Sequence, residues 1–285
     1  MPNIRQLKRR IGTVKNTAKI TNALQLVAAS KMRRAQDRAL QSRPYADKLS
    51  FVLAGLATKG SDSEEAAHPL LISRPVENVA VLHITPNRGL CGGLNSNLNR
   101  AAGTFVAAQE QPVNLVAVGK KGREQLRRDF AANMVGHVDM SEVKRVGYSN
   151  AQAIARDVLA RFEAGECDVV TIFYNRFQSV ISQIPTEQQI IPAKFEAGAA
   201  TALYDYEPSE EAILADLLPR GVATQIFTAL LENGASEQGA RMSAMDNATR
   251  NAGEMITKYT TIYNRSRQAA ITKELIEIIS GAEAL

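Results

Sequence analysis

The sequence is poor in the residues that build disulfide frameworks, metal centres and membrane spans. It contains two cysteines and three histidines among 285 residues, and Cys91 and Cys167 stand in no CxxC or metal-ligand spacing. At most one disulfide could join them, and we expect a reduced cytosolic chain without a metal or other cofactor. No apolar run approaches the roughly 18 residues of a membrane span and no signal peptide is recognisable, so we expect neither membrane insertion nor export.

Proline is also scarce at the two ends of the chain. None occurs between Pro2 and Pro44, and none follows Pro219. In the N-terminal stretch, eleven positions at alternating spacings of three and four form one seam, and nine of them are apolar. The seam consists of Ile4, Leu7, Ile11, Val14, Ala18, Thr21, Gln25, Ala28, Met32, Ala35 and Ala39. A sustained period of 3.5 residues predicts a coiled-coil helix, with Asn3 as its N-cap.

The C-terminal stretch carries a second seam. Ser209, followed by two glutamates, predicts a helix start, since a serine cap and acidic residues stabilise the first turn. One continuous helix from there to Ser280 would measure on the order of 100 Å, with kinks or frayed turns at its glycines. Its predicted seam is Met245, Ala248, Ala252, Met255, Tyr259, Ile262, Ser266 and Ala269. Because small residues line both seams, they bury little apolar area, which predicts a slender shaft held by a surrounding partner.

Two apolar surfaces extend beyond these seams. Residues 271–279 (ITKELIEII) are apolar around most of the helix, and Ile20, Leu24 and Val27 lie beside the N-terminal seam. Apolar surfaces of this kind usually mark contact sites. We therefore expect a partner to cover both.

Residues 76 to 207 have a different pattern. β-Branched runs at 76–85, 113–119 and 168–174 alternate with stretches of helical composition at 96–108, 120–130 and 150–164. This alternation predicts an open, mostly parallel, Rossmann-like α/β sheet, and the prolines of segment 182–192 place that segment at an edge. The predicted division is an N-terminal coiled-coil helix (1–58), a linker (59–75), an α/β domain (76–207) and a C-terminal coiled-coil helix (208–285).

Basic residues are concentrated in the N-terminal helix. Residues 1–60 hold thirteen lysines and arginines against two aspartates, although the net charge of the whole chain is only +5. Such a surface is either a solvated helix face or a contact for an acidic partner, and the imbalance favours a partner. A nucleic acid would call for aromatic groups among the charges, and the segment offers only Tyr45 and Phe51. The partner could be a nucleic acid or an acidic protein, so a nucleic-acid-binding or scaffolding coiled coil stays as an alternative.

The most enzyme-like segment is Pro86–Asn95 (PNRGLCGGLN), between a predicted strand and a predicted helix. A glycine-rich loop there could hold a phosphate, and Cys91 near a helix N-terminus could be an activated nucleophile. The loop lacks both the P-loop and the G-x-G-x-x-G spacing, and no histidine stands in motif spacing to Cys91. We predict a structural turn and keep an α/β enzyme as an alternative. The residues of this turn are Gly89, Cys91, Gly92 and Gly93.

Three segments together resemble one protein family. Ile11–Arg34 (IGTVKNTAKITNALQLVAASKMRR), Arg88–Asn95 (RGLCGGLN) and Arg267–Ala282 (RQAAITKELIEIISGA) are similar to the gamma subunit of bacterial F-type ATP synthase. The similarity runs from Ile4 to the C-terminus. It implies an antiparallel coiled coil of the two terminal helices with an α/β domain. It also implies a central rotor stalk that transmits proton-driven rotation and is not itself an enzyme.

The resemblance further implies partners, a location and contact residues. A ring of alpha and beta subunits would surround the coiled coil, and the epsilon subunit and the membrane c-ring would meet the α/β domain. The chain would be a peripheral subunit at the cytoplasmic face of the bacterial inner membrane. The implied contacts to the alpha–beta ring are Arg9, Leu24, Lys31, Arg33, Arg34, Arg267, Gln268, Thr272 and Glu274, and those to epsilon and the c-ring are Tyr204, Tyr206 and Glu207.

Overall fold

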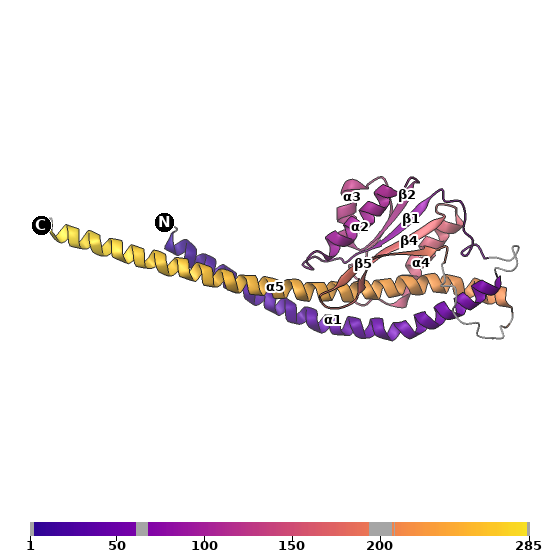
Figure 1. Cartoon of the computed structure of the whole chain (residues 1–285), viewed down its shortest axis with the longest axis horizontal. Helices are drawn as coiled ribbons and strands as arrows, with labels where there is room; N and C mark the ends of the chain where they lie inside the picture. The colour runs from indigo at the N-terminus through magenta and orange to yellow at the C-terminus, as the bar shows by residue number, and fades with distance from the viewer. Residues whose placement is uncertain (1–2, 61–67, 194–206, 208, 284–285) are drawn as a thin grey trace. The chain divides into compact units, whose positions relative to one another are not determined.

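The computed structural model describes residues 3–60, 68–193, 207 and 209–283. The chain divides into two compact units: Met1–Ala29 with Arg241–Leu285, called here the coiled-coil unit, and Ser30–Ala240, called the α/β unit. Two long helices, α1 (Ile4–Gly60) and α5 (Glu210–Glu283), contribute to both units (Figure 1). The boundaries at residues 58, 75 and 207 stay predictions.

Both long helices begin where their capping residues predict. The Asn3 carboxamide oxygen accepts a hydrogen bond from the Arg5 backbone N–H at 2.9 Å. The Ser209 hydroxyl accepts one from the Ala212 backbone N–H at 3.2 Å. Each cap satisfies an amide of the first turn that has no partner inside the helix.

Helix α5 is continuous over 74 residues, and Pro219 lies inside it. Two of its glycines lie where another element comes close. A β-carbon at Gly221 would lie 2.8 Å from the Leu53 Cδ1 of α1, and one at Gly239 would lie 3.2 Å from the Phe177 ring. These glycines therefore permit close packing, which compensates for their low helix propensity.

The coiled-coil unit contains an antiparallel pair formed by the start of α1 and the end of α5. The Thr21 and Thr249 hydroxyl oxygens lie 2.7 Å apart, and the Gln25 carboxamide donates to the Asp246 carboxylate at 3.0 Å. Higher numbers on α1 thus meet lower numbers on α5. The two polar positions of the predicted α1 seam form this hydrogen-bonded layer, a device that fixes register in coiled coils.

The predicted α1 seam is confirmed, and of the eight predicted α5 seam residues only Met255 is exposed. None of the eleven α1 seam residues is exposed. On α5, Met255 is 42% exposed while Ile256 is half-buried, and Thr249 rather than Ala248 meets Thr21. Ile256 therefore takes the place predicted for Met255 in the α5 core, and Thr249 shares the core with half-buried Ala248.

The α/β unit contains one five-stranded sheet in the order β3-β2-β1-β4-β5. The strands are β1 (Val79–Ile84), β2 (Val113–Val118), β3 (Met134–Val138), β4 (Val169–Phe177) and β5 (Gln183–Ile191). Four strands are parallel, and β5 pairs antiparallel with β4 at the edge. The Rossmann-like α/β prediction is confirmed and the segment around β5 is an edge strand as expected. Strand β3 was not predicted, because it is short, contains Gly136 and is only partly buried.

Helices cover both faces of this sheet. The shorter ones are α2 (Leu94–Ala108), α3 (Lys120–Asp129) and α4 (Tyr148–Glu163). One core lies between the sheet, α2 and α3 and includes Val81, Leu98, Leu115, Leu126 and Phe173. The other joins the sheet to α4 and to parts of α1 and α5, and includes Leu53, Ile172, Ile154, Leu218 and Ile226. The segments of α1 and α5 in this unit are thus part of the domain core.

One helix stretch, Glu211–Ala282 of α5, is long and apolar enough to cross a membrane by length and composition alone. Its most apolar 18-residue window has a mean hydropathy of 1.2, and half of that window is buried inside the protein. A core helix passes the same test. Because half of this window is packed against other parts of the protein, its hydropathy is weak evidence for a membrane span.

Candidate subunit interface

The basic candidates on α1 point away from its seam. Arg9 of the coiled-coil unit is exposed, and Leu24, about four turns further along α1 in the same unit, is half-buried. In the α/β unit, Lys31, Arg33 and Arg34 are exposed. The Arg34 guanidinium donates to the Ser30 hydroxyl at 3.0 Å, within the same helix. Within each unit these basic side chains are therefore accessible to a partner.

The coiled-coil unit also exposes apolar side chains beyond its seam. On α1, Ile20 is 60% and Leu26 is 66% exposed, and Val27 is 50% exposed. Leu26 belongs with this surface, although the sequence prediction named only Ile20, Leu24 and Val27. A run of apolar groups on one helix in water is a typical contact surface.

The end of α5 is exposed over its whole circumference. Ser266 is its last buried residue, and every described side chain from Ile271 to Ala282 is exposed. In Figure 1 the C-terminal end of α5 continues past the N-terminal end of α1. This tip therefore has no partner helix beside it. Its large apolar side chains are Ile271, Leu275, Ile276, Ile278 and Ile279.

The remaining predicted contacts lie on exposed surface or outside the described residues. Arg267, Gln268, Thr272 and Glu274 are exposed on α5. Thr272 donates its hydroxyl proton to the Gln268 backbone oxygen at 2.9 Å, an internal helix bond that leaves the carboxamide of Gln268 accessible. For the epsilon and c-ring contacts, Glu207 is exposed, and Tyr204 and Tyr206 lie outside the described residues.

The glycine-rich loop packs against α5 within the α/β unit. Leu90 and Gly92 have φ angles of 61° and 57°, and the turn that they make buries Cys91 and Leu94 against Ala240. Gly89 is half-buried and Gly93 precedes α2 as its N-cap residue. The buried contact gives the loop a packing role, and its assignment as a structural turn stays a prediction.

Both cysteines are buried thiols, Cys91 at 2% and Cys167 at 1% exposure. Burial, with the charges of Asp168 and Glu166, raises the pKa of Cys167 to about 11. A thiol with such a pKa stays protonated at neutral pH and is a poor nucleophile.

We expect Cys91→Ala to leave the chain without any turnover of its own, as in the unaltered protein. The change removes one buried sulfur atom next to Ala240 and should lower the free energy of unfolding by about 1 kcal/mol. Cys167→Ala, at an equally buried position, is the matched control. Hydrolysis of ATP or of activated esters by the isolated chain, abolished by Cys91→Ala alone, would establish the alternative of an α/β enzyme.

His83 is the most deeply buried titratable group of the sheet, at 0% exposure. Its Nε2 lies 2.6 Å from the Asn99 carboxamide oxygen, and Asn99 in turn donates to the Gln125 side chain. Burial lowers the pKa of His83 to about 4, with the Asn99 hydrogen bond opposing the shift. The imidazole is therefore neutral at physiological pH and structural in role.

This burial predicts that acid destabilises the α/β unit. Above pH 6.5 the imidazole is neutral in folded and unfolded chains alike, so its contribution is fully present. Between pH 6.5 and about 4 only the unfolded chain binds the proton, and stability falls by up to about 3 kcal/mol. Urea unfolding at pH 7 and pH 4, followed by near-ultraviolet circular dichroism, measures this loss. Between pH 7 and pH 4 the free energy of unfolding of His83→Gln should fall by about 3 kcal/mol less than that of the unaltered protein. The same pH dependence in both proteins would contradict the lowered pKa of His83.

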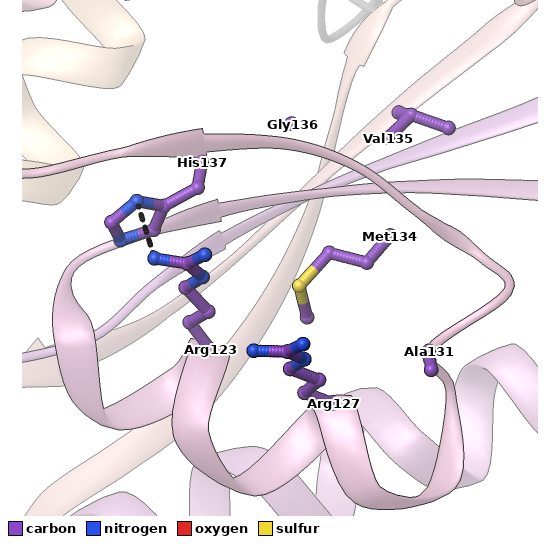
Figure 2. Close-up of a pocket in the computed structure, with 7 residues that line it drawn as sticks. All are labelled: Arg123, Arg127, Ala131, Met134, Val135, Gly136 and His137. Carbon is purple, nitrogen blue, oxygen red and sulfur yellow. Dashed lines mark hydrogen bonds between the residues drawn. The ribbon is translucent and has the colours of Figure 1, made fainter.

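One hollow of ≈ 340 Å³ lies beside the edge strand β3. Figure 2 shows Arg123 and Arg127 of α3 below it and His137 of β3 beside Arg123, with 3.4 Å between Arg123 Nη1 and His137 Nδ1. Burial and the Arg123 charge lower the pKa of His137, so the ring is neutral. No cysteine, serine or carboxylate lines the hollow, and its polar side chains are Arg123, Arg127 and His137. Over the described part of the chain, no three histidine, cysteine or acidic residues form a metal site either.

The structure adds polar residues that the sequence reasoning did not single out. Thr249 and Asp246 complete the polar layer of the coiled coil. Glu232 is buried on α5, where Arg43 contacts it across 3.0 Å. The signal that could have revealed Glu232 is a charged residue inside the apolar run TALLENGAS of a helix that is otherwise buried.

Comparisons with known proteins match the whole chain. A family model described as ATP synthase matches residues 3–285. The chain is similar to the ATP synthase gamma chain of Fuscovulum blasticum, with 68% identity over 289 residues and 100% of both chains covered. It is similar to that of Dinoroseobacter shibae at 65% identity over 290 residues, again with 100% of both covered.

Solved structures show the same fold. A chain of the Euglena gracilis mitochondrial ATP synthase OSCP/F1/c-ring structure matches with a TM-score of 0.71 and 21% identity, covering 99% of this chain and 94% of that chain. A chain of the Tetrahymena thermophila mitochondrial ATP synthase central stalk and c-ring structure matches with a TM-score of 0.63 and 27% identity, covering 80% and 99%.

Proposed function

Because the chain belongs to the ATP synthase gamma chain family, as its three motif segments predict, we propose that it is the central rotor stalk of an F-type ATP synthase and has no catalytic residues of its own. The observation that carries this proposal is the family match over residues 3–285. The coiled coil of α1 and α5, with its closed seam and exposed outer faces, supports the same role.

The outer faces of the coiled coil suit enclosure by other subunits. An alanine-rich seam buries little apolar area and contributes less stability than a leucine seam would. Several apolar side chains would be buried only by a sleeve, that is, a ring of partner subunits around the coiled coil. They are Ile20, Leu26, Val27 and those of the apolar tip of α5. We assign that sleeve to the alpha and beta subunits, with Arg9, Lys31, Arg33 and Arg34 against acidic beta surfaces. Leu24, Arg267, Gln268, Thr272 and Glu274 complete the proposed contacts.

Rotation of this asymmetric surface provides the coupling. Each orientation of the stalk offers a given beta subunit a different face: basic, apolar or neutral. A face that interacts more favourably with one beta conformation shifts that subunit toward it, as any differentially binding ligand does. Proton-driven rotation of the c-ring would thus drive the beta subunits in turn through substrate binding and product release.

The α/β unit is the proposed foot of the rotor. Glu207 lies on its exposed surface, and we assign that residue, with Tyr204 and Tyr206, to contact with the epsilon subunit and the c-ring. The complex is membrane-associated. We place this chain at the cytoplasmic face of the bacterial inner membrane as a peripheral subunit that does not insert into the bilayer and binds no nucleic acid.

Reconstitution with the alpha and beta subunits tests this function. We expect the full chain to co-purify with them and to change their ATPase rate, while the isolated chain hydrolyses no ATP. Titration of the isolated chain with duplex DNA at two salt concentrations is the parallel measurement for the basic surface. Steeply salt-dependent DNA binding together with no association with alpha and beta subunits would favour the nucleic-acid-binding alternative.

A further inference from the structure

One buried carboxylate in the α/β unit joins three elements. Glu232 of α5 is 5% exposed. One of its oxygens accepts a hydrogen bond from the Arg43 guanidinium of α1 at 3.0 Å. The other accepts one from the backbone N–H of Phe177, at the end of β4, at 2.7 Å. A single side chain thus holds the last strand of the parallel set against both long helices.

Neighbouring groups extend the same attachment. The Asn175 carboxamide donates to the Asn233 carboxamide oxygen at 3.1 Å, and the Ser236 hydroxyl donates to the Asn175 backbone oxygen at 2.9 Å. All three of these residues are buried. The end of β4 is therefore joined to about one turn of α5 by directional bonds from Glu232, Asn233 and Ser236.

Energetics distinguish this cluster from ordinary packing. A buried carboxylate is costly unless it is paired and hydrogen-bonded, and well-packed apolar residues would often stabilise the fold as well. What charge-assisted bonds add is fixed direction. Apolar contacts such as those of Leu218 and Ile226 resist separation of the layers but are non-directional, so they oppose sliding less. The bonds of Glu232 oppose any movement of the β4 end along or around α5.

We propose that Glu232 is a positioning residue that makes the attachment of the α/β sheet to α5 torsionally stiff, so that torque applied to the sheet enters the long helix without slack. This inference rests on the proposed rotor function. The carboxylate acts through Arg43 and the Phe177 amide and touches no substrate. It sets how much of each rotational step is lost to twisting of the rotor.

The test uses the complete ATP synthase carrying Glu232→Gln. With the alpha–beta ring fixed to a surface and a bead attached to the α/β unit, the angular fluctuations of the paused rotor give its torsional stiffness. We expect stiffness to fall at least twofold and ATP synthesis at low proton-motive force to fall about fivefold, with ATP hydrolysis by the complex within twofold of normal. Asp216→Asn is the matched control, because the Asp216–Arg220 pair lies on the same helix with both side chains more than half exposed.

A second variant covers the case in which Glu232→Gln does not assemble. Arg43→Gln removes the positive charge that pairs with Glu232. Because the Arg43 side chain is 49% exposed, we expect this variant to assemble, with a smaller drop in rotor stiffness of about 1.5-fold. Unchanged stiffness in the assembled variant, or an equal drop in Asp216→Asn, would overturn the proposal. A purely structural role would lower thermal stability without softening the assembled rotor. If a bead on the complex with the unsubstituted chain does not rotate when ATP is added, the proposed rotor function is wrong. If that bead rotates but the Glu232→Gln rotor is as stiff as the unsubstituted one, only the proposal for Glu232 is wrong.

Discussion

Deletion of residues 268–285 is expected to reduce proton-coupled ATP synthesis to less than about a tenth of its normal rate. The reason is that the deletion removes several apolar side chains that the alpha and beta subunits would bury in the complex. The described part of this segment is exposed in the isolated chain, apart from half-buried Ala269 and Ala270. It contains the five large apolar side chains of the tip, 50–71% exposed. The fold should survive, because Ser266, the last buried seam residue, remains. Synthesis in sealed vesicles and thermal unfolding of the chain measure the two effects separately.

Stepwise deletion sharpens this test. Removing residues 280–285 should have a small effect, removing 275–285 a larger one and removing 268–285 the largest, because each step deletes more apolar surface. A deletion of 283–285, beyond the tip residues, is the control. Full synthesis after removal of everything past Arg267 would show that the tip contributes no needed contact.

Reversal of two charges on α1, Arg33→Glu with Arg34→Glu, is expected to lower coupled synthesis about tenfold, since like charges brought together at an interface cost several kcal/mol. Both side chains are exposed, so helix content should not change. The loss should shrink at high ionic strength, where exposed charges are screened. Synthesis and far-ultraviolet circular dichroism are the two measurements.

The control for charge reversal lies on the same helix. Lys15 and Lys19 are also exposed and are not among the proposed contacts, so Lys15→Glu with Lys19→Glu changes net charge equally. It should lower synthesis less than twofold. Parallel loss of helix content and synthesis in the Arg33 and Arg34 variant would mean that folding, and not contact with beta, is affected.

The sequence predicted the long helices and the α/β sheet because their signals are local. Heptad spacing, proline positions and caps at Asn3 and Ser209 depend on neighbouring residues. The α5 seam was wrong at Met255 and omitted Thr249, because Ala248 and Thr249, or Met255 and Ile256, are equally acceptable at a core position. Only pairing across the coiled coil, such as that of Thr249 with Thr21, decides between them.

The polar residues of the fold were beyond sequence reasoning for a related reason. Glu232 finds its partners 189 and 55 residues away along the chain, at Arg43 and Phe177. No spacing rule links such positions, and a charged residue in an apolar helix face shows only that a partner must exist. Strand β3 was missed because its edge position leaves it half-exposed, which weakens the apolar signal on which strand prediction depends.

As a rotor stalk this chain would turn relative to the catalytic ring, and direct observation of rotation tests that. The alpha and beta subunits are fixed to a surface, a bead is attached to the α/β unit, and ATP is added. We expect continuous rotation of the bead in one direction, at a rate that follows ATP hydrolysis. A bead that stays still while the same complexes hydrolyse ATP would contradict it.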